Sequence, residues 1–447
     1  MTPGGIPELE ALDSGSAGVR IPPGDTAPLT PRVRAILDTA ALRRLARVSQ
    51  LGLVALVYPG AVHSRLEHSL GVYRLALEFL RRLRHDPRFS TAVDDRDAAA
   101  FLVAALVHDI GHWAYCHPIE DMGLAEIPRH ETLVSGLVNA EPLAGVIRGQ
   151  WQLDPARIAA LITGSATDHA GRILHSLLSG PVDVDKMDYL ARDSLHAGVP
   201  YGHNFDQPRL LASLCLDETG TSLAITAKGR TAAELMVFAR YVMFSEVYWH
   251  HAVRAATGML QRAMWMLRGV IDPRALVRLD DAGFAEWLTA AAAGTPAEPL
   301  AAGLFGPQRR LFKRVVAFDA VRRPDVHAAV AGRPYAEMVE ISSRLSDSLS
   351  RRHGRNVPAG MVIVDAPPAE REVEFRLQVR EPASGPQSGA TWRRLEDISP
   401  VVRSLAYQQF DDLVKQVRIY ADPDWAEVVA PAGGLEELLL EAAARRR

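Results

Sequence analysis

The feature that most limits how this chain can fold is an uninterrupted apolar run over residues 98–107, which ends directly at His108 and Asp109. Ten residues are too few to cross a bilayer as a helix, and apolar side chains all round are typical of a helix buried in a protein core. Burying the polar pair at its end costs free energy unless both side chains have partners. A bound metal would provide those partners, and so would a capped helix end with a hydrogen-bonded histidine.

The length of the chain predicts more than one folding unit. With 447 residues, of which 48% are hydrophobic and 23% charged, it exceeds one typical core and has the composition of a globular enzyme. Residues 1–30 are rich in Pro, Gly and Ser, which predicts a flexible leader. Residues 31–290 carry mostly helical patterns and should form the catalytic domain. The Gly and Pro residues within 291–303 predict a boundary, and residues 304–447 predict a smaller α+β lobe.

Charge, cysteine content and hydropathy narrow the possible partners and compartments. The formal net charge of −3 gives no overall attraction to nucleic acid, so a nucleic-acid partner is possible but not favoured. Cys116 and Cys215 are too few for a disulfide framework, and a reducing compartment is the expectation. No apolar run reaches about 18–20 residues, and the N-terminus has no basic start followed by an apolar stretch. We therefore expect a cytoplasmic protein without a membrane segment.

Periodicity predicts helices in the long N-terminal part and short strands near the end. Thr231 and Glu234 form a capping-box signature ahead of a long helical segment through Met266. Short strands are predicted at 361–364 and 417–420. One apolar helix face is predicted from Val72, Leu75, Ala76, Phe79, Leu80 and Leu83. A further strand is predicted from the alternating apolar residues Val373, Phe375, Leu377 and Val379. The fold class expected is mostly α, with a smaller C-terminal α+β lobe.

Three short segments carry the residue types of a metal site: residues 63–69, 108–112 and 183–189. Imidazole and carboxylate groups together suit a divalent cation. At helical spacing, Asp185 and Tyr189 fall on one face of a helix. Histidines are also crowded in one part of the chain, at His63, His68, His108, His112, His117 and His130. Surface histidines would not need to gather in this way, so the crowding favours a functional site.

The order of these residues resembles a known family. His68, then His108-Asp109, then Asp185 match the H…HD…D signature of the HD superfamily of metal-dependent phosphohydrolases. The longer strings over residues 58–72 and 183–193 resemble the branch that contains dGTP triphosphohydrolases and the sterile-alpha-motif HD-domain dNTP triphosphohydrolase. The resemblance implies a helical HD-domain core. It also implies hydrolysis of a deoxynucleoside triphosphate to deoxynucleoside and inorganic triphosphate.

The resemblance assigns a role to each matching residue. The implied ligands of one divalent metal (Mn, Fe, Mg, Ni or Zn, not determined by the sequence) are His68, His108, Asp109 and Asp185. The implied catalytic residues are His117, with Glu120 as its orienting carboxylate, His130, Arg65 and Lys186. The implied substrate-binding residues are Tyr189, Asp193, His112, His251 and Gln50. His112 could instead bind a second metal.

Arg65 and Lys186 match the family's phosphate-contacting positions. Cations are needed there to stabilise the negative charge that accumulates on the phosphates. Their alternative is a solvated surface charge. His117 is expected to protonate the departing oxygen, a task that suits a group titrating near neutrality.

The sequence also departs from the family pattern. An Asp-Thr pair of the family's guanine-nucleotide activator site is present at Asp38, but Ala46 stands where an activator-contacting arginine would lie. Residues 22–26 replace the upstream Asp-Pro-Ile-His-Gly element. We therefore expect a homo-oligomer that forms without nucleotide and hydrolyses substrate without added GTP. By position, Tyr241 replaces an arginine that grips the triphosphate, and Trp249 replaces a tyrosine of the sugar pocket.

Two other functions stay open at this point. The chain could be an HD phosphohydrolase that acts on a nucleoside monophosphate, a cyclic nucleotide or an alarmone. It could also be a non-catalytic module that keeps a structural metal and binds nucleic acid, for which salt-dependent DNA binding would be the sign. The complete ligand signature and the pocket histidines argue against the second of these.

Overall fold

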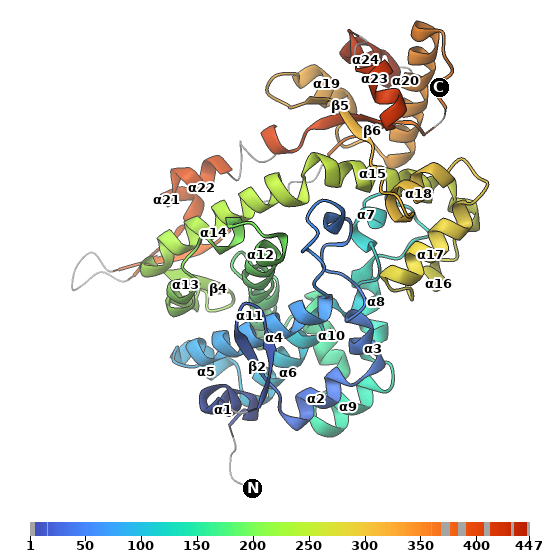
Figure 1. The fold of residues 1–447 in the computed structure, drawn as a ribbon. Helices are drawn as coiled ribbons and strands as arrows, with labels where there is room; N and C mark the ends of the chain where they lie inside the picture. The colour runs from blue at the N-terminus through green and yellow to red at the C-terminus, as the bar shows by residue number, and fades with distance from the viewer. Residues whose placement is uncertain are drawn as a thin grey trace.

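The computed structural model describes residues 5–15, 17–358, 360–367, 376–382, 390–405, 412–430 and 433–444. Most of these residues are helical, which confirms the predicted fold class. Figure 1 shows helices α19, α20, α23 and α24 gathered at one end of the molecule, with α1 at the opposite end.

Short 3-10 helices are marked η, and η5 is a π-helix. The first part of the chain contains α1 (Pro7–Ser14), β1 (Gly18–Ile21), β2 (Asp25–Pro28), α2 (Pro31–Leu37), α3 (Ala40–Leu45), η1 (Gly52–Leu56), α4 (Arg65–Leu83), α5 (Pro87–Ala92), α6 (Asp95–Val107), η2 (His108–Gly111), α7 (Cys116–Glu120), α8 (His130–Val138), α9 (Leu143–Gln150), α10 (Pro155–Thr163), α11 (His169–Leu178), α12 (Val184–Ala197) and η3 (Tyr201–His203). The second part contains α13 (Gln207–Ser213), β3 (Leu214–Leu216), β4 (Leu223–Thr226), η4 (Ala227–Gly229), α14 (Arg230–Met243), η5 (Phe244–Tyr248), α15 (His251–Met266), η6 (Arg268–Val270), α16 (Pro273–Leu276), α17 (Asp281–Ala292), α18 (Glu298–Phe305), β5 (Lys313–Phe318), α19 (Pro324–Val330), α20 (Tyr335–His353), β6 (Val362–Asp365), β7 (Gln378–Glu381), β8 (Thr391–Arg394), α21 (Leu395–Ile398), α22 (Pro400–Ser404), β9 (Val417–Ala421), α23 (Pro423–Val429) and α24 (Leu435–Ala444).

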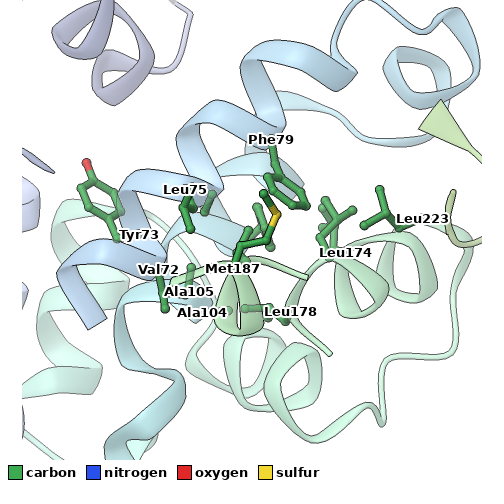
Figure 2. Packing of buried hydrophobic residues seen from close by; sticks show 14 of the residues in the cluster. Val72, Tyr73, Leu75, Phe79, Ala104, Ala105, Leu174, Leu178, Met187 and Leu223 are labelled. Atoms are coloured by element: carbon green, nitrogen blue, oxygen red, sulfur yellow. The ribbon is translucent and has the colours of Figure 1, made fainter. Parts of the chain in front are cut away.

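The core that holds the site is built on α4 and α6. Asp94 begins α6 by accepting the backbone N–H of Asp97 at 2.8 Å, and residues 98–107 are buried throughout, as predicted. The predicted apolar face of α4 is also buried along its whole length. Figure 2 shows Phe79 of α4 and Met187 of α12 packed together inside this core. His108 therefore leaves a buried helix at a fixed position beside two other buried helices.

The N-terminal segment is not a flexible leader over residues 7–28, so that prediction is wrong there. Helix α1 and the β1–β2 hairpin pack on α4, and the side chains of Leu9 and Ile21 are buried in the main core. Glu8 is fully buried and accepts hydrogen bonds from Thr30 at 2.7 Å and from Arg32 at 2.8 Å. A buried carboxylate needs such partners, and these lie more than twenty residues away in the sequence.

The long helical segment after residue 230 is interrupted, and its predicted cap is wrong. Helix α14 already begins at Arg230, so Thr231 lies inside the helix, and Glu234 pairs with Arg230 at 3.1 Å instead of capping the helix. The π-helix η5, which has wider turns than an α-helix, follows α14, and α15 begins at His251. Its end at Met266 agrees with the prediction.

Two small sheets carry the C-terminal strands. Strands β6 and β9 lie where short strands were predicted, and they pair antiparallel in a sheet of order β5-β9-β6. Strand β7 runs parallel to β4 in a second sheet of order β3-β4-β7-β8. Leu377 and Val379 of the predicted alternating strand are buried, whereas Val373 and Phe375 lie outside the described residues. No helix in the described part of the chain is long and apolar enough to cross a membrane.

A test of the corrected N-terminus compares two glutamates of α1. Glu8→Ala leaves Arg32 and Thr30 without their shared acceptor and should lower the free energy of unfolding by about 2–3 kcal/mol in urea denaturation. The matched control is Glu10→Ala, because Glu10 lies on the same helix but is exposed. Equal stability of the two variants would favour the original prediction of a loosely held leader.

Candidate functional site

Three predicted metal ligands converge from three different elements. His68 of α4 is fully buried, and its Nε2 atom lies 3.2 Å from Nε2 of His108 in η2 and 3.0 Å from Oδ1 of Asp185 in α12. The distance from His108 Nε2 to the same Asp185 oxygen is 3.7 Å. One donor atom from each of these three residues lies within 4.8 Å of the others. The three segments singled out in the sequence thus meet at one point.

This donor set fits a divalent cation. Atoms that bind one such cation at about 2.1 Å lie about 3.0–3.4 Å apart, close to the separations found here. The Nδ1 atom of His108 donates to the Ala105 carbonyl at 2.9 Å, and Nδ1 of His68 donates to Oδ2 of Asp188 at 2.8 Å. With both Nδ1 atoms engaged as donors, the neutral rings present their Nε2 lone pairs to the same point.

The electrostatics of the set favour a positive charge at that point. Burial opposes protonation of His68, but hydrogen bonds to Asp185 and Asp188 raise its pKa to about 10. Burial likewise opposes protonation of His108, but the charge of Asp109 and a hydrogen bond with Asp185 together raise its pKa. The pKa of Asp185 is lowered, against burial, by its hydrogen bonds with the two histidines. The protein has therefore gathered carboxylates around a point where a cation would sit.

Asp109, the fourth predicted ligand, lies at the edge of this set. Its Oδ1 atom is 3.3 Å from His108 Nε2 and 3.2 Å from His112 Nδ1, whereas Oδ2 accepts a hydrogen bond from Arg65 at 2.8 Å. Arg65 is 4% exposed, and burial of its own charge is offset by Asp109, which raises the pKa of the guanidinium. The role of Asp109 as a ligand therefore stays a prediction.

The pocket histidines are arranged differently from the predicted dyad. Glu120 was expected to orient His117, but its carboxylate instead accepts hydrogen bonds from Nδ1 of His130 at 2.9 Å and from the His130 backbone N–H at 2.6 Å. That N–H belongs to the first residue of α8, where helical N–H groups have no partner within the helix, so a carboxylate is favoured there. His117 contacts His112 instead, with 3.2 Å between the two Nε2 atoms.

One cavity of about 680 Å³ unites most of the predicted site. The predicted residues that line it are Gln50, Arg65, His108, Asp109, His112, His117, His130, Asp185, Tyr189 and Asp193. Its far wall is formed by Ile162, Thr163, His175, Leu178 and Ser179 of the α10–α11 region. Gln50 contributes a buried amide oxygen without a hydrogen-bond partner among the described residues. A cavity of this size suits a small molecule with both polar and apolar parts.

Comparisons with known proteins identify the family. A family profile described as HD domain matches residues 65–192, and one described as HD associated region matches residues 205–441, which is more than half of the chain. The chain belongs to the HD superfamily. The first match contains the converging ligands and much of the cavity wall. The two matches meet between 192 and 205, whereas the sequence patterns favoured a division at 291–303, and the predicted domain limits remain a prediction.

Related HD proteins match about half of the chain. An uncharacterized protein, YwfO, of Bacillus subtilis is 34% identical over 239 residues, covering 53% of this chain and 52% of YwfO. A protein of Gallus gallus named deoxynucleoside triphosphate triphosphohydrolase SAMHD1 is 31% identical over 248 residues, covering 48% of this chain and 39% of that protein. The chain thus spans about half the length, or less, of the curated relatives it matches.

Solved structures show the same fold along nearly the whole chain. A hypothetical protein from Aquifex aeolicus superimposes with a TM-score of 0.68 at 23% identity, covering 93% of this chain and 99% of that one. A structure titled phosphohydrolase, from Bacteroides thetaiotaomicron, gives a TM-score of 0.67 at 22% identity and covers 91% and 99% of the two chains. At these identities the likeness establishes the HD fold.

Four predicted residues do not line the cavity: His68 and Glu120, described above, and Lys186 and His251. Lys186 donates from Nζ to Asp183 at 2.6 Å, so its charge is already paired beside the metal-ligand set. His251 opens α15 with its ring centroid 4.3 Å from that of His250. Burial and the neighbouring His250 lower the pKa of His251 to about 4. The structure does not bring His251 to the other site residues.

The aromatic residue that faces the cavity is not the one singled out in the sequence. Tyr248, rather than Trp249, lines the cavity, and its hydroxyl donates to Oδ2 of Asp193 at 2.6 Å. Trp249 is 7% exposed and packs under the guanidinium of Arg254 at 4.6 Å. Eight residues before Tyr248 stands Arg240, whose positive charge opposes the rise in the Tyr248 pKa that burial causes. Arg240 and Tyr248 have the same spacing as positions 241 and 249, and their correspondence to the family's arginine and tyrosine stays a prediction.

Other residues were missed altogether. Asp188 and His63 were not assigned roles, yet Asp188 holds the ligand His68 and His63 holds Asp193 at 2.9 Å. The signal for Asp188 was its place three residues after Asp185, on the same side of α12. His63 was noticed only as part of the histidine crowding.

The metal assignment predicts a large loss of binding on removal of one central ligand. Asp185→Ala should abolish Mn²⁺ binding, measured as metal content by elemental analysis, because the variant loses the carboxylate shared by both imidazoles. His175→Ala serves as control, since His175 lines the same cavity away from the ligand set. Unchanged metal content in Asp185→Ala would refute the assignment. If Asp185→Ala keeps its metal and loses it only when His117 is also replaced, the cation lies in the neighbouring cluster of His112, Cys116, His117 and His130.

Proposed function

We propose that this chain is a metal-dependent dNTP triphosphohydrolase that releases deoxynucleoside and intact triphosphate. The observation that carries the proposal is one cavity lined by the predicted ligands His108, Asp109 and Asp185 together with Arg65, Tyr189, Asp193 and Tyr248. In the proposed reaction Arg65 contacts the phosphates, whereas Tyr189, Asp193 and Tyr248 form the sugar end. The relatives named dNTP triphosphohydrolase lend support, although the chain covers only about two fifths of their length.

The sugar end of the proposed site is built around Asp193. Its carboxylate is fixed from both sides, by His63 at 2.9 Å and by the Tyr248 hydroxyl at 2.6 Å, and it is almost fully buried. Tyr189 lies beside it, with its ring centroid 6.5 Å from that of Tyr248. A carboxylate held this firmly can accept a hydrogen bond from a sugar hydroxyl without reorganising. We propose that the close packing of these rings excludes a 2′-hydroxyl.

The phosphate end is supplied by two cations, of which Arg65 is buried and Arg240 is partly buried. The Nε atom of Arg65 is buried and has no hydrogen-bond partner in the described part of the chain, while its Nη1 atom is held by Asp109. Arg240 contributes a second positive charge near both Tyr189 and Tyr248. Because Lys186 is already paired with Asp183, we assign the main phosphate contacts to Arg65 and Arg240. Buried cations of this kind stabilise accumulating negative charge more strongly than solvent-exposed ones.

The proposed reaction forms a bond from a water oxygen to the α-phosphorus and breaks the bond from that phosphorus to the sugar oxygen. His68, His108 and Asp185, with Asp109 beside them, would hold the cation. The chemistry that a divalent cation supplies at such a site is polarisation of a phosphoryl oxygen and a lower pKa for water. The proton for the departing sugar oxygen comes from His117 in this scheme, and the water gives up its protons to solvent.

His117 is neutral near pH 7 in the free protein. Burial and the charge of Arg65 lower its pKa to about 4. A bound triphosphate brings negative charge to the cavity and raises the pKa of the imidazole, so that protonation accompanies substrate binding.

This role makes His117→Ala the sharpest test of the proton donor. The variant should lose about 10²–10⁴ in kcat while keeping its metal, because a general acid contributes that much. His130→Ala is measured beside it, since Glu120 orients His130 rather than His117. If His130→Ala shows the large loss and His117→Ala does not, the proton comes from His130.

Product analysis tests the reaction itself. All dNTPs, NTPs and NMPs should be incubated with the Mn²⁺-loaded protein and the products separated by chromatography. The proposal predicts deoxynucleoside and triphosphate from dNTPs, with NTPs much poorer substrates. Release of dNMP and pyrophosphate would rule out attack at the α-phosphorus with a triphosphate leaving group. Release of phosphate from monophosphates alone would favour one of the other HD phosphohydrolase reactions. These are the second candidate because Lys186, a predicted phosphate contact, is already paired with Asp183.

Regulation and assembly belong to the proposal as well. Ala46 ends α3 and offers no cation to an activating nucleotide, and the β1–β2 hairpin takes the place of the family's upstream element. An activator must bind the active state more tightly than the inactive one, and a missing cation weakens that difference. We therefore keep the prediction of a homo-oligomer that is active without GTP.

A further inference from the structure

A buried arginine outside the proposed reaction ties three parts of the chain together: α12, α4 and the β1–β2 hairpin. Arg192 of α12 is 5% exposed, and its Nε and Nη2 atoms each donate at 2.8 Å to the two oxygens of Asp188. Its Nη1 atom donates to Oε1 of Glu67 at 2.8 Å and to the carbonyl oxygen of Pro22 at 3.2 Å. A planar guanidinium with this many fixed partners has one orientation only.

The arginine reaches the metal-ligand set through a single side chain. Oδ2 of Asp188 accepts from Nε of Arg192 and also from Nδ1 of His68, both at 2.8 Å. A carboxylate on the second nitrogen of a histidine fixes its tautomer and ring orientation and makes it a better ligand. The position of Asp188, and with it the direction in which His68 Nε2 points, is therefore set by Arg192.

The α4 backbone is adapted to this pair. A Cβ atom at Gly71 would lie 1.9 Å from Oδ1 of Asp188 and 2.3 Å from Nη2 of Arg192. Glycine lowers the stability of a helix interior, yet here no larger residue fits unless the ion pair moves. Gly71 thus provides a way to displace the pair without removing either of its members.

The N-terminal hairpin closes the network from outside. Pro22 lies in the turn between β1 and β2, and its carbonyl faces the guanidinium of Arg192. This hairpin, predicted from composition to be mobile, is therefore in direct contact with the support of a metal ligand.

A second branch runs toward the sugar end of the cavity. Glu67 also pairs with His196 at 2.9 Å, and the His196 ring stacks on His63 with centroids 4.3 Å apart. His63 in turn holds Asp193. Glu67 therefore contacts both Arg192, which positions the carboxylate behind His68, and His196, which leads to Asp193 at the proposed sugar end.

We propose that Arg192 is a positioning residue for the metal site, and that the β1–β2 hairpin forms part of this site by holding Arg192 in place. The inference deepens the proposed function, since it concerns the same site, but it makes its claim about metal affinity and not about the substrate. The geometry that carries it is the unbroken series of hydrogen bonds from Pro22 through Arg192 and Asp188 to His68.

The experiment measures Mn²⁺ affinity of the full-length protein by calorimetry, with kcat and KM measured in parallel. Arg192→Gln should weaken Mn²⁺ binding about 10–100-fold, the usual effect of losing support behind a metal ligand. Gly71→Ala should weaken it in the same direction, because it pushes the ion pair aside. Arg192→Lys keeps the charge but cannot hold both oxygens of Asp188, so its affinity should fall between those of wild type and Arg192→Gln.

The matched control is Arg254→Gln, since Arg254 is also buried and pairs with both oxygens of one carboxylate, that of Asp365, at 2.5 and 3.1 Å. Its affinity for Mn²⁺ should equal that of wild type even where its thermal stability falls. Equal weakening in Arg254→Gln would mean that Arg192 acts only through global stability, and unchanged affinity in folded Arg192→Gln or Gly71→Ala would overturn the proposal. These readouts stand even if no dNTP is hydrolysed.

The hairpin is tested separately. Gly18→Val places side-chain atoms against Thr26 and Ala27 of the paired strand, where a Cβ atom would already lie 2.4 and 2.6 Å away. It should lower Mn²⁺ affinity several-fold without altering any residue of the network, whereas Arg20→Ala, on the exposed side of β1, should not. Wild-type affinity in Gly18→Val would remove the hairpin from the metal site.

Discussion

The arrangement of the molecule depends on bringing two imidazole nitrogens and a carboxylate to one buried point. His68 and His108 face each other at 3.2 Å with both Nδ1 atoms already engaged, and Asp185 completes the set. Such a cluster of lone pairs and charge is unfavourable in a protein interior unless a cation or protons compensate it. The helices α4, α6 and α12 hold it because each is anchored in the apolar core along most of its length.

Support around this point extends well beyond the ligands. The buried residues Asp188 and Arg192 and the partly buried Glu67 form a connected set of charges behind His68, and Arg65 donates a hydrogen bond to Oδ2 of Asp109. The cost of burying these charges is offset only while every partner stays in place. This explains why a segment as remote as the N-terminal hairpin is ordered against the catalytic core.

The sequence was informative where the controlling interactions are local or follow a strict pattern. The run 98–107 and the apolar face of α4 were predicted because helical burial depends on spacing within one segment. The predicted ligands His68, His108 and Asp185, which the structure brings together, were singled out because their order and residue types resemble the family signature. The ordered helix α1 was missed because Glu8 depends on Arg32, a long-range pair that local composition does not reveal.

The site details that failed have the same origin. Glu120 was assigned to the histidine three residues before it, but the free N–H at the start of the next helix draws it to His130. The assignment of Trp249 rested on counting along a helix, whereas the π-helix η5 widens the chain directly before Tyr248. A π-helix does not keep the spacing of an α-helix. Counting along the sequence therefore cannot decide whether Tyr248 or Trp249 faces the cavity.

The most direct test of the account is to locate the metal by anomalous diffraction from crystals grown with Mn²⁺. The account predicts one strong peak between Nε2 of His68, Nε2 of His108 and the carboxylate of Asp185, with ligand distances of about 2.1 Å. A peak confined to the cluster of His112, Cys116, His117 and His130, with none at the predicted point, would contradict it.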